Sequence, residues 1–443
     1  MTASTLLSLP RQEPPGRVGE LRSLARTTPG VLIFCMVGAV LVSVLAGVFT
    51  AVNVQSRAAA LDSLANRSGE LSVAAQDIYR GLSDADATAN GAFLSGGREP
   101  ANVRARYESD IAKAESALAV AVAAREPADL ADPSSPLGVL SAKLSVYTGL
   151  VETARANNLQ GLPVGAAYQR EASNLMRTEL LPAAQDLYTT ETAGVAEDQD
   201  DAAALPIVEV LLALATLVVL VYAQRFLRRR TRRRLNVGLA IATVAAIASL
   251  LWVVVATIGV MANVNASREN GSTQTDVLAQ ARIAALAARG DETLTLVARG
   301  SGGAFEERYE KTQQELAGGD GLLAEARGLA SAPDVVDAVA TATEAQRSWQ
   351  QVHTAIRTAD DSGDYPQAVT LTIGTDPNGA ATHFDKVDEQ LARAIEHTQS
   401  AFSDEVSQAD SALTGTVIGV ILLALVTAGG AVFGIWQRLK EYR

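Results

Sequence analysis

The sequence is poor in the side chains that most often carry chemistry. Its 443 residues include one cysteine, Cys35, and three histidines, and aromatic residues make up 5% of the chain. A single cysteine excludes an internal disulfide and a thiolate metal site, and Cys35 lies in an apolar run where packing is its expected role. Zinc sites favour histidines four residues apart or close to carboxylates, whereas His353, His383 and His397 are scattered. We therefore expect no metal site and no cofactor.

Sequence signatures of catalysis are missing as well. No phosphate-binding loop, dinucleotide fingerprint or nucleophile elbow follows a predicted strand. Few segments show the alternating apolar and polar pattern that is typical of strands. We therefore expect that the protein is not an enzyme.

The chain does contain four long apolar stretches, which occur as two pairs at 30–52, 205–223, 237–262 and 413–436. About 20 apolar helical residues span a hydrocarbon core of about 30 Å, so each stretch is long enough, or nearly so, to cross a membrane. The first follows several arginines, as a signal peptide would, but far exceeds the usual apolar core of about 7–15 residues. We expect four retained transmembrane helices. Their one formal charge, Glu209, is near a helix end and is expected to reach the membrane interface.

Positive charge is concentrated in the segments that flank these stretches. The whole chain carries a net charge of −12, yet 1–29, 224–236 and 437–443 are basic, whereas 53–204 and 263–412 are acidic. Lys and Arg accumulate on the cytoplasmic side of membrane proteins, so we predict that both termini and the arginine loop are cytoplasmic. The protein is then a multi-pass plasma-membrane protein with two extracytoplasmic regions. Its cytoplasmic segments are too short to fold into a domain.

Both acidic regions have the pattern of four antiparallel helices. Apolar residues recur every three or four positions, which is the spacing of a helix that packs along one seam. We predict an all-α protein with four transmembrane helices and two extracytoplasmic up-down four-helix bundles. The first and last helices of each bundle are expected to continue unbroken into the transmembrane helices. The third-helix residues expected to be buried are Leu137, Leu140, Leu144, Tyr147, Val151 and Ala154 in the first region, and Val335, Val339, Ala342, Gln346, Trp349, His353 and Ile356 in the second.

Local matches indicate that the second region repeats the first. Three short phrases of the first region recur in the second, and Pro182 and Pro377 fall at comparable points of the predicted fourth helices. The order of these matches is the same in both regions, which favours an internal duplication. The matched phrases are Asn53-Val-Gln-Ser-Arg57 with Asn263-Val-Asn-Ala-Ser-Arg268, Asp86-Ala-Thr88 with Asp291-Glu-Thr293, and Arg106-Tyr107 with Arg308-Tyr309.

The architecture resembles the four-helix-bundle sensor domains of chemoreceptors and sensor kinases. The resemblance covers both acidic regions and includes the hairpin phrase Asp84-Ala-Asp-Ala-Thr-Ala-Asn-Gly-Ala-Phe-Leu-Ser-Gly96. It departs from those families where they carry their output, because no HAMP, kinase or methyl-accepting segment follows. In its length, its paired bundles and its missing output segment, the chain is similar to the actinobacterial GlnX-type membrane proteins.

This resemblance implies a signal-relay function. GlnX-type proteins are thought to relay amino-acid availability, reported by the binding lipoprotein GlnH, to the cytosolic Ser/Thr kinase PknG. The implied partners are an extracytoplasmic solute-binding protein, or its ligand directly, and a separate cytosolic effector; a homo-oligomer is compatible with the sequence. A non-switching scaffold of an envelope complex is the alternative. A transporter is disfavoured because the apolar stretches lack interior charges and broken helices around a polar site.

Seven arginines between the second and third apolar stretches are candidate contacts for anionic lipid headgroups or for an acidic cytosolic effector. No aromatic or structured module accompanies them, so nucleic acid is not an expected partner. They also fix the orientation of the chain in the membrane. These residues are Arg225, Arg228, Arg229, Arg230, Arg232, Arg233 and Arg234.

Arginines of the acidic regions could bind a ligand carboxylate, although most are expected to form surface ion pairs. His353 falls on an apolar seam, where a structural role is favoured over pH sensing. The candidate ligand or partner contacts are Arg80, Arg106, Arg289, Arg308 and His353. The segment Gly374–Gly379 interrupts an otherwise helical run and is a candidate kink or lid.

Overall fold

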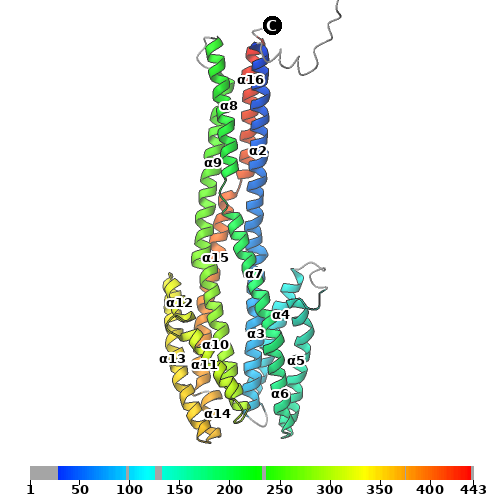
Figure 1. Ribbon diagram of the computed structural model, residues 1–443, viewed down its shortest axis with the longest axis vertical. Helices are drawn as coiled ribbons and strands as arrows, with labels where there is room; N and C mark the ends of the chain where they lie inside the picture. Colours follow the sequence, from blue (N-terminus) through cyan, green and yellow to red (C-terminus); the bar gives the residue numbers. More distant parts are fainter. Residues whose placement is uncertain (1–27, 96–98, 125–131, 232–235, 375, 441–443) are drawn as a thin grey trace, which may run out of the picture. The chain divides into compact units, whose positions relative to one another are not determined.

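The computed structural model describes residues 28–95, 99–124, 132–231, 236–374 and 376–440 (Figure 1). These ranges are helical apart from short connections and contain no strand, which confirms the predicted all-α class. The chain divides into two compact units. The first comprises Met1–Ala58, Ala204–Gly259 and Ala412–Arg443, and the second comprises Ala59–Ala203 and Val260–Ser411.

The first unit contains the four apolar helices. Within the described residues, four helical runs are long and apolar enough to cross a membrane. Helices α9 and α16 pack closely, because a Cβ atom on Gly238 would lie only 2.5 Å from the backbone nitrogen of Gly434. Small residues allow this close backbone approach between membrane helices. The apolar helices are α2 (Thr28–Asn66), α8 (Ile207–Thr231), α9 (Val237–Ser267) and α16 (Thr416–Leu439).

Glu209, the one acid of the predicted apolar stretches, is buried within this unit, and its place at the membrane interface stays a prediction. Its side chain is 5% exposed, accepts a hydrogen bond from Asn53 of α2 and lies 3.8 Å from Arg57. Arg57 also donates to the hydroxyl of Thr257 on α9 at 3.1 Å. Burying an unpaired charge costs several kcal/mol, so internal pairing is the physical alternative to interfacial solvation. These side chains join three of the apolar helices.

The second unit begins with bundle 1, formed by residues 68–202. Its third-helix residues are buried as predicted. Helix α5 begins sharply, because Pro136 occupies its first turn and Ser135 accepts a hydrogen bond from the Gly138 nitrogen at 3.1 Å. The elements are α3 (Ser68–Ser95), α4 (Ala101–Ala123), α5 (Pro136–Leu159), α6 (Val164–Leu175), the π-helical turn η1 (Met176–Leu180) and α7 (Leu181–Ala202).

Pro182 lies near the start of α7 and does not interrupt the fourth helix of bundle 1. Proline cannot donate a backbone hydrogen bond, and its ring clashes with the carbonyl four residues earlier in a regular α-helix. The wider π-helical turn η1 directly precedes α7 and accommodates this proline. Pro377 lies in the turn before α15, so both prolines stand near the start of the last helical segment of their bundle, although only the second follows a break in the helix.

Bundle 2 is formed by residues 268–413. Its third-helix residues are also buried as predicted, but the short helices α12 and α14 are added to the four main helices. The segment Gly374–Gly379 separates α14 from α15, as its sequence indicated. The elements are the π-helical turn η2 (Arg268–Ser272), α10 (Thr273–Val297), α11 (Gly303–Ala317), α12 (Leu322–Leu329), α13 (Pro333–Asp361), α14 (Tyr365–Ile373) and α15 (Ala380–Leu413).

The last helix of each bundle is interrupted before the following apolar helix, so the expectation of unbroken helices was wrong there. Helix α7 ends at Ala202 and α8 begins at Ile207, after Pro206. Helix α15 ends at Leu413, and Gly415 adopts a φ of +76° that favours glycine. By contrast, α2 and α9 run past the predicted apolar stretches without a break.

The two bundles meet along a common interface, which we call the seam. Helices α3 and α10 contact each other there. Leu94 of α3 belongs to the apolar core of bundle 2, and Ala279 of α10 belongs to the core of bundle 1. The two bundles therefore share apolar surface within one unit.

Candidate functional site

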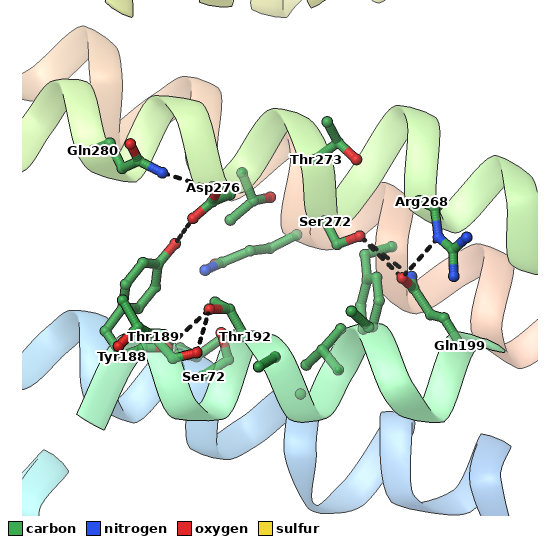
Figure 2. A pocket seen from close by; sticks show the side chains of 18 of the residues that line it. Ser72, Tyr188, Thr189, Thr192, Gln199, Arg268, Ser272, Thr273, Asp276 and Gln280 are labelled. Atoms are coloured by element: carbon green, nitrogen blue, oxygen red, sulfur yellow. Dashed lines mark hydrogen bonds between the residues drawn. The ribbon is translucent and has the colours of Figure 1, made fainter. Parts of the chain in front are cut away.

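A cavity of about 530 Å³ lies in the seam (Figure 2). Its walls come from α3 and α7 of bundle 1 and from η2, α10 and α15 of bundle 2. Small-molecule sites in proteins commonly enclose about 300–1,000 Å³ and combine apolar walls with a few polar groups. The cavity has this composition, since hydroxyl and amide side chains alternate with alanine, valine and phenylalanine. It is the candidate functional site.

Asp276 marks one end of the cavity (Figure 2). The Tyr188 hydroxyl donates to one of its carboxylate oxygens and the Gln280 amide donates to the other, both at 2.9 Å. Burial and the neighbouring charge of Asp276 raise the pKa of Tyr188, so its hydroxyl stays protonated and donates. Within the described chain, no cationic side chain lies within 4 Å of Asp276. Neutral donors from both bundles thus hold a carboxylate at the cavity wall.

Gln199 of α7 marks the other end. Its amide nitrogen lies 3.1 Å from the Ser267 hydroxyl and 3.3 Å from the Ser272 hydroxyl, and its carbonyl accepts from Arg268 at 3.4 Å. Arg268 also pairs with Asp200 at 2.7 Å, where Asp200 is exposed and Arg268 partly exposed, so water screens this pair. Hydrogen bonds therefore bridge the two bundles at both ends of the cavity.

Phe402 of α15 lies beside the cavity, where Gly271 makes room for it. A Cβ atom on Gly271 would lie 2.6 Å from the Cβ of Phe402, and one on Gly69 would lie 3.5 Å from its ring. A second cavity of about 720 Å³ shares Gly69, Gln399 and Phe402 with the first. Phe402 therefore packs closely against the backbone of η2 and stands between the two cavities.

Three polar side chains of the cavity wall are available to a ligand. Ser72, Gln185 and Thr273 line the cavity, and none of them makes a side-chain hydrogen bond to any residue that the structure describes. They come from α3, α7 and α10, so a molecule that contacted all three would touch both bundles.

The five residues proposed from the acidic regions do not line this cavity. Arg80 lies 3.4 Å from Asp77 and borders the second cavity. Arg106 lies 3.4 Å from Asp385 across the seam. The other three belong to bundle 2, where Arg308 pairs with Asp291 at 2.8 Å and Arg289 and His353 join a buried network. Each of these arginines pairs with a carboxylate.

The buried network of bundle 2 is centred on Glu292 of α10, whose side chain is 0% exposed. It accepts hydrogen bonds from Trp349 at 3.0 Å, from Nδ1 of His353 at 2.9 Å and from Arg289. Nε2 of His353 lies 2.9 Å from Glu306. Burial alone would lower the pKa of His353, but Glu292 and Glu306 raise it to about 9. His353 is therefore cationic at neutral pH, which favours the structural role.

Bundle 1 has a corresponding network around Asp86 of α3. Asp86 accepts hydrogen bonds from the Tyr147 hydroxyl at 3.2 Å, from Ser173 at 2.9 Å and from Asn90 at 3.0 Å. Gln169 extends the network by donating to Asn90 at 2.8 Å. Burial raises the pKa of Asp86, and these neutral donors together with the charge of Arg177 offset that effect only in part.

The arginine loop is described only in part. Arg225, Arg228 and Arg229 are exposed near the end of α8. Arg230 belongs to the same helix, whereas Arg232, Arg233 and Arg234 lie outside the described residues. Their predicted contacts with lipid or an effector stay predictions.

Sequence reasoning missed the cavity residues, because they match no motif and lie on segments far apart in the chain. The available signals were weak. Gly69 and Gly271 stand inside helical patterns, where a glycine often marks a close backbone approach. No periodicity would reveal that both glycines face the same phenylalanine.

Comparison with known proteins gives one family match. Residues 60–200 match the family described as the actinobacterial sensor domain. No curated protein and no solved structure matches the chain. The matched segment contains α3 and α7, which form the bundle 1 wall of the cavity. The chain is thus a membrane protein with a segment that is similar to an actinobacterial sensor domain, and a sensory function follows from that likeness.

Proposed function

We propose that the protein is a transmembrane signal-relay sensor whose input acts at the seam cavity. The observation that carries this proposal is that one cavity of about 530 Å³ has walls from both bundles, one of which matches a sensor domain. A molecule or a partner segment that enters it contacts both halves of the duplication. Its binding therefore depends on how the two bundles are arranged.

Signalling follows from differential affinity. An input that binds one arrangement of the bundles more tightly than another shifts the population toward that arrangement. The cavities on either side of Phe402 and the few hydrogen bonds at the cavity ends are proposed to allow small shifts of α3, α7 and α10. Because α2 and α9 continue beyond the apolar stretches as unbroken helices, sliding or tilting along them is the proposed route across the membrane.

The input is proposed to be extracytoplasmic and the effector cytosolic. By resemblance to the GlnX-type proteins, the input is amino-acid availability, sensed directly or through a GlnH-like lipoprotein, and the effector is a PknG-like kinase. The positive-inside rule supports cytoplasmic termini, and the exposed arginines of α8 are the proposed surface for lipid and effector contact. The protein itself contributes no catalysis in this proposal.

Crosslinking of intact cells tests the relay. Cells are shifted between amino-acid-rich and amino-acid-poor medium, crosslinked, and the full-length protein is isolated from membranes. We expect to recover an exported solute-binding protein and a soluble cytosolic effector, at least one of them in amounts that change with the shift. Recovery of neither partner under any condition contradicts the proposal.

A cavity-filling substitution tests the site. Ser72→Trp places an indole in the cavity without breaking a hydrogen bond of the described chain, and Ser109→Trp adds the same bulk on the exposed face of α4. Only Ser72→Trp is expected to abolish the change in partner recovery. Cysteine pairs between α3 and α7 in a Cys35→Ser background test the scaffold alternative, which requires the same crosslinks in both media.

A further inference from the structure

The seam cavity has a charged side chain at each end, and the described residues that line it between the ends are uncharged (Figure 2). Asp276 of α10 lies at one end, and Arg268 of η2 lies at the other. These two residues are about 12 Å apart along the helix axis. A small ligand therefore meets the two charges separately.

The positive charge at the Arg268 end is already compensated. Arg268 pairs with Asp200 at 2.7 Å and donates a hydrogen bond to the side-chain carbonyl of Gln199 at 3.4 Å. An anionic ligand at this end would lie beside the carboxylate of Asp200, and like charges repel each other. This end of the cavity therefore offers hydroxyl and amide groups rather than a free cation.

The negative charge at the Asp276 end is not compensated in this way. One carboxylate oxygen accepts from the Tyr188 hydroxyl and the other from the Gln280 amide, both at 2.9 Å, and both donors are uncharged. No cationic side chain of the described residues lies within 4 Å of Asp276. A carboxylate can accept about four hydrogen bonds, so Asp276 keeps capacity for a further donor.

An ammonium group supplies what this end of the cavity lacks. It carries one positive charge and three donors, and its hydrogen bonds to a carboxylate are stronger than those of neutral donors. Ser72 of α3 lines the same cavity, and its hydroxyl makes no side-chain hydrogen bond to any described residue. The wall thus offers a neutral acceptor from bundle 1 as well as the carboxylate from bundle 2.

A free α-amino acid fits the Asp276 end less well than an amine does. Its carboxylate is attached to the carbon that carries the ammonium group, so both groups would lie close to Asp276. Two carboxylates at one site repel each other, and Arg268 is too far along the helix to neutralise the second one. An amine without a neighbouring carboxylate avoids this repulsion.

We propose that the seam cavity binds a small organic amine as a cation, with its ammonium group at Asp276 and an uncharged remainder between the two bundles. The amine is a direct input to the proposed sensor, so this assignment rests on the proposed function and adds the chemical class of the ligand. A cavity of about 530 Å³ has room for such a molecule. Contact with a binding lipoprotein is then a separate interaction.

Saturation-transfer NMR on the full chain in phosphatidylcholine nanodiscs tests the ligand class. The probe is tyramine, and its matched controls are tyrosol, in which a hydroxyl replaces the amine, and tyrosine, which adds the carboxylate. Because only tyramine brings a positive charge without a like charge beside Asp276, we expect it to bind about tenfold more tightly than either control, or tighter still.

Substitutions locate the ammonium group. Asp276→Asn keeps an oxygen that accepts from Tyr188 but removes the charge, so it should weaken tyramine binding about tenfold and leave tyrosol binding unchanged. Asp186→Asn makes the same chemical change at an exposed position of α7 outside the cavity and should have no effect. Ser72→Trp fills the cavity and should abolish tyramine binding. Circular dichroism of each variant checks that the helices are retained.

Equal binding of tyramine and tyrosol, tighter binding of tyrosine, or tyramine binding that persists in Asp276→Asn would overturn the proposal. If tyramine does not bind while Asp276→Asn lowers recovery of the exported partner, a lysine of that partner occupies the site and the small-amine proposal is wrong. Partner recovery that still changes with the medium when tyramine does not bind leaves the sensor proposal standing. Tyramine binding without recovery of either partner instead contradicts the relay alone.

Discussion

Bundles 1 and 2 share one design of buried network but differ in its charge. In both, an acid on the first helix accepts a hydrogen bond from an aromatic residue of the third helix. Tyr147 donates to Asp86 in bundle 1, and Trp349 donates to Glu292 in bundle 2. The remaining partners of Asp86 are neutral, whereas those of Glu292 are Arg289 and His353. The second helices also correspond, because Tyr107 and Tyr309 both have buried hydroxyls without a partner in the described chain.

Two bundles with similar buried networks therefore differ in the electrostatics of those networks. Burial raises the pKa of Asp86, and the charge of Arg177 opposes that effect only in part. Burial acts in the same direction on Glu292, but His353 and Arg289 lower its pKa overall. The acid of the bundle 1 network therefore has a raised pKa, and the acid of the bundle 2 network has a lowered pKa.

The largest expected effect is on bundle 2. Glu292→Ala would leave Arg289 and His353 buried without their acid, and removing one partner of a buried ion pair costs about 3–5 kcal/mol. Thermal unfolding of the full chain in nanodiscs should show this loss, and Glu307→Ala on the exposed face of α11 is the control. A loss no larger than that of the control would remove the basis of the comparison.

The next effect is pH dependence in bundle 2. The raised pKa of His353 gives a stabilisation that is complete below its ordinary value near 6.5 and is lost as the pH rises through about 9. Its size is on the order of 3 kcal/mol. Hydrogen exchange of α13, corrected for intrinsic rates, should therefore accelerate above pH 8 in the wild type, and His353→Gln should remove that dependence.

A smaller effect is expected for bundle 1. Asp86→Asn keeps an oxygen that accepts from Tyr147 and Ser173, so we expect a loss of about 1 kcal/mol, the usual scale of a neutral hydrogen bond. The unfolding measurement used for Glu292→Ala applies here. Equal losses for Asp86→Asn and Glu292→Gln would show that the two networks do not differ in kind.

The smallest effect is expected at the surface of the seam. Arg106 and Asp385 are both about half exposed, and such pairs contribute about 0.2–1 kcal/mol. Arg106→Ala should therefore change the unfolding temperature little at physiological salt. A loss comparable to that of Glu292→Ala would mean that this pair, rather than the buried networks, dominates the unit.

The sequence was sufficient for the helices and for the faces that they bury. The apolar face of α13 from Val335 to Ile356 is buried as its spacing predicts, because periodicity indicates which face of a helix avoids water. Periodicity does not report which helix covers that face. The partners of His353 come from α10 and α11, and the cavity walls come from both bundles, so neither was predictable.

Backbone irregularities were also beyond the sequence pattern. The π-helical turns η1 and η2 shift the register by one residue, which a pattern of three and four spacings cannot distinguish from scatter. Pro182 indicated a local disturbance but not its form. The pairing of Glu209 with Asn53 and Arg57 depends on three-dimensional neighbours that hydropathy ignores.

The central claim is that an input at the seam changes how the two bundles are arranged. The most direct measurement is the distance between spin labels at Thr190 on α7 and Glu396 on α15, two exposed positions that do not line the cavity. The distance is measured in the full chain in nanodiscs, before and after the addition of the twenty amino acids and of the lipoprotein fraction from the cells used for crosslinking. After the addition, we expect a second distance between the two spin labels in the chain that carries Ser109→Trp. In the chain that carries Ser72→Trp, we expect the original distance alone. An unchanged distance while the lipoprotein co-purifies with the chain would contradict it and favour a scaffold.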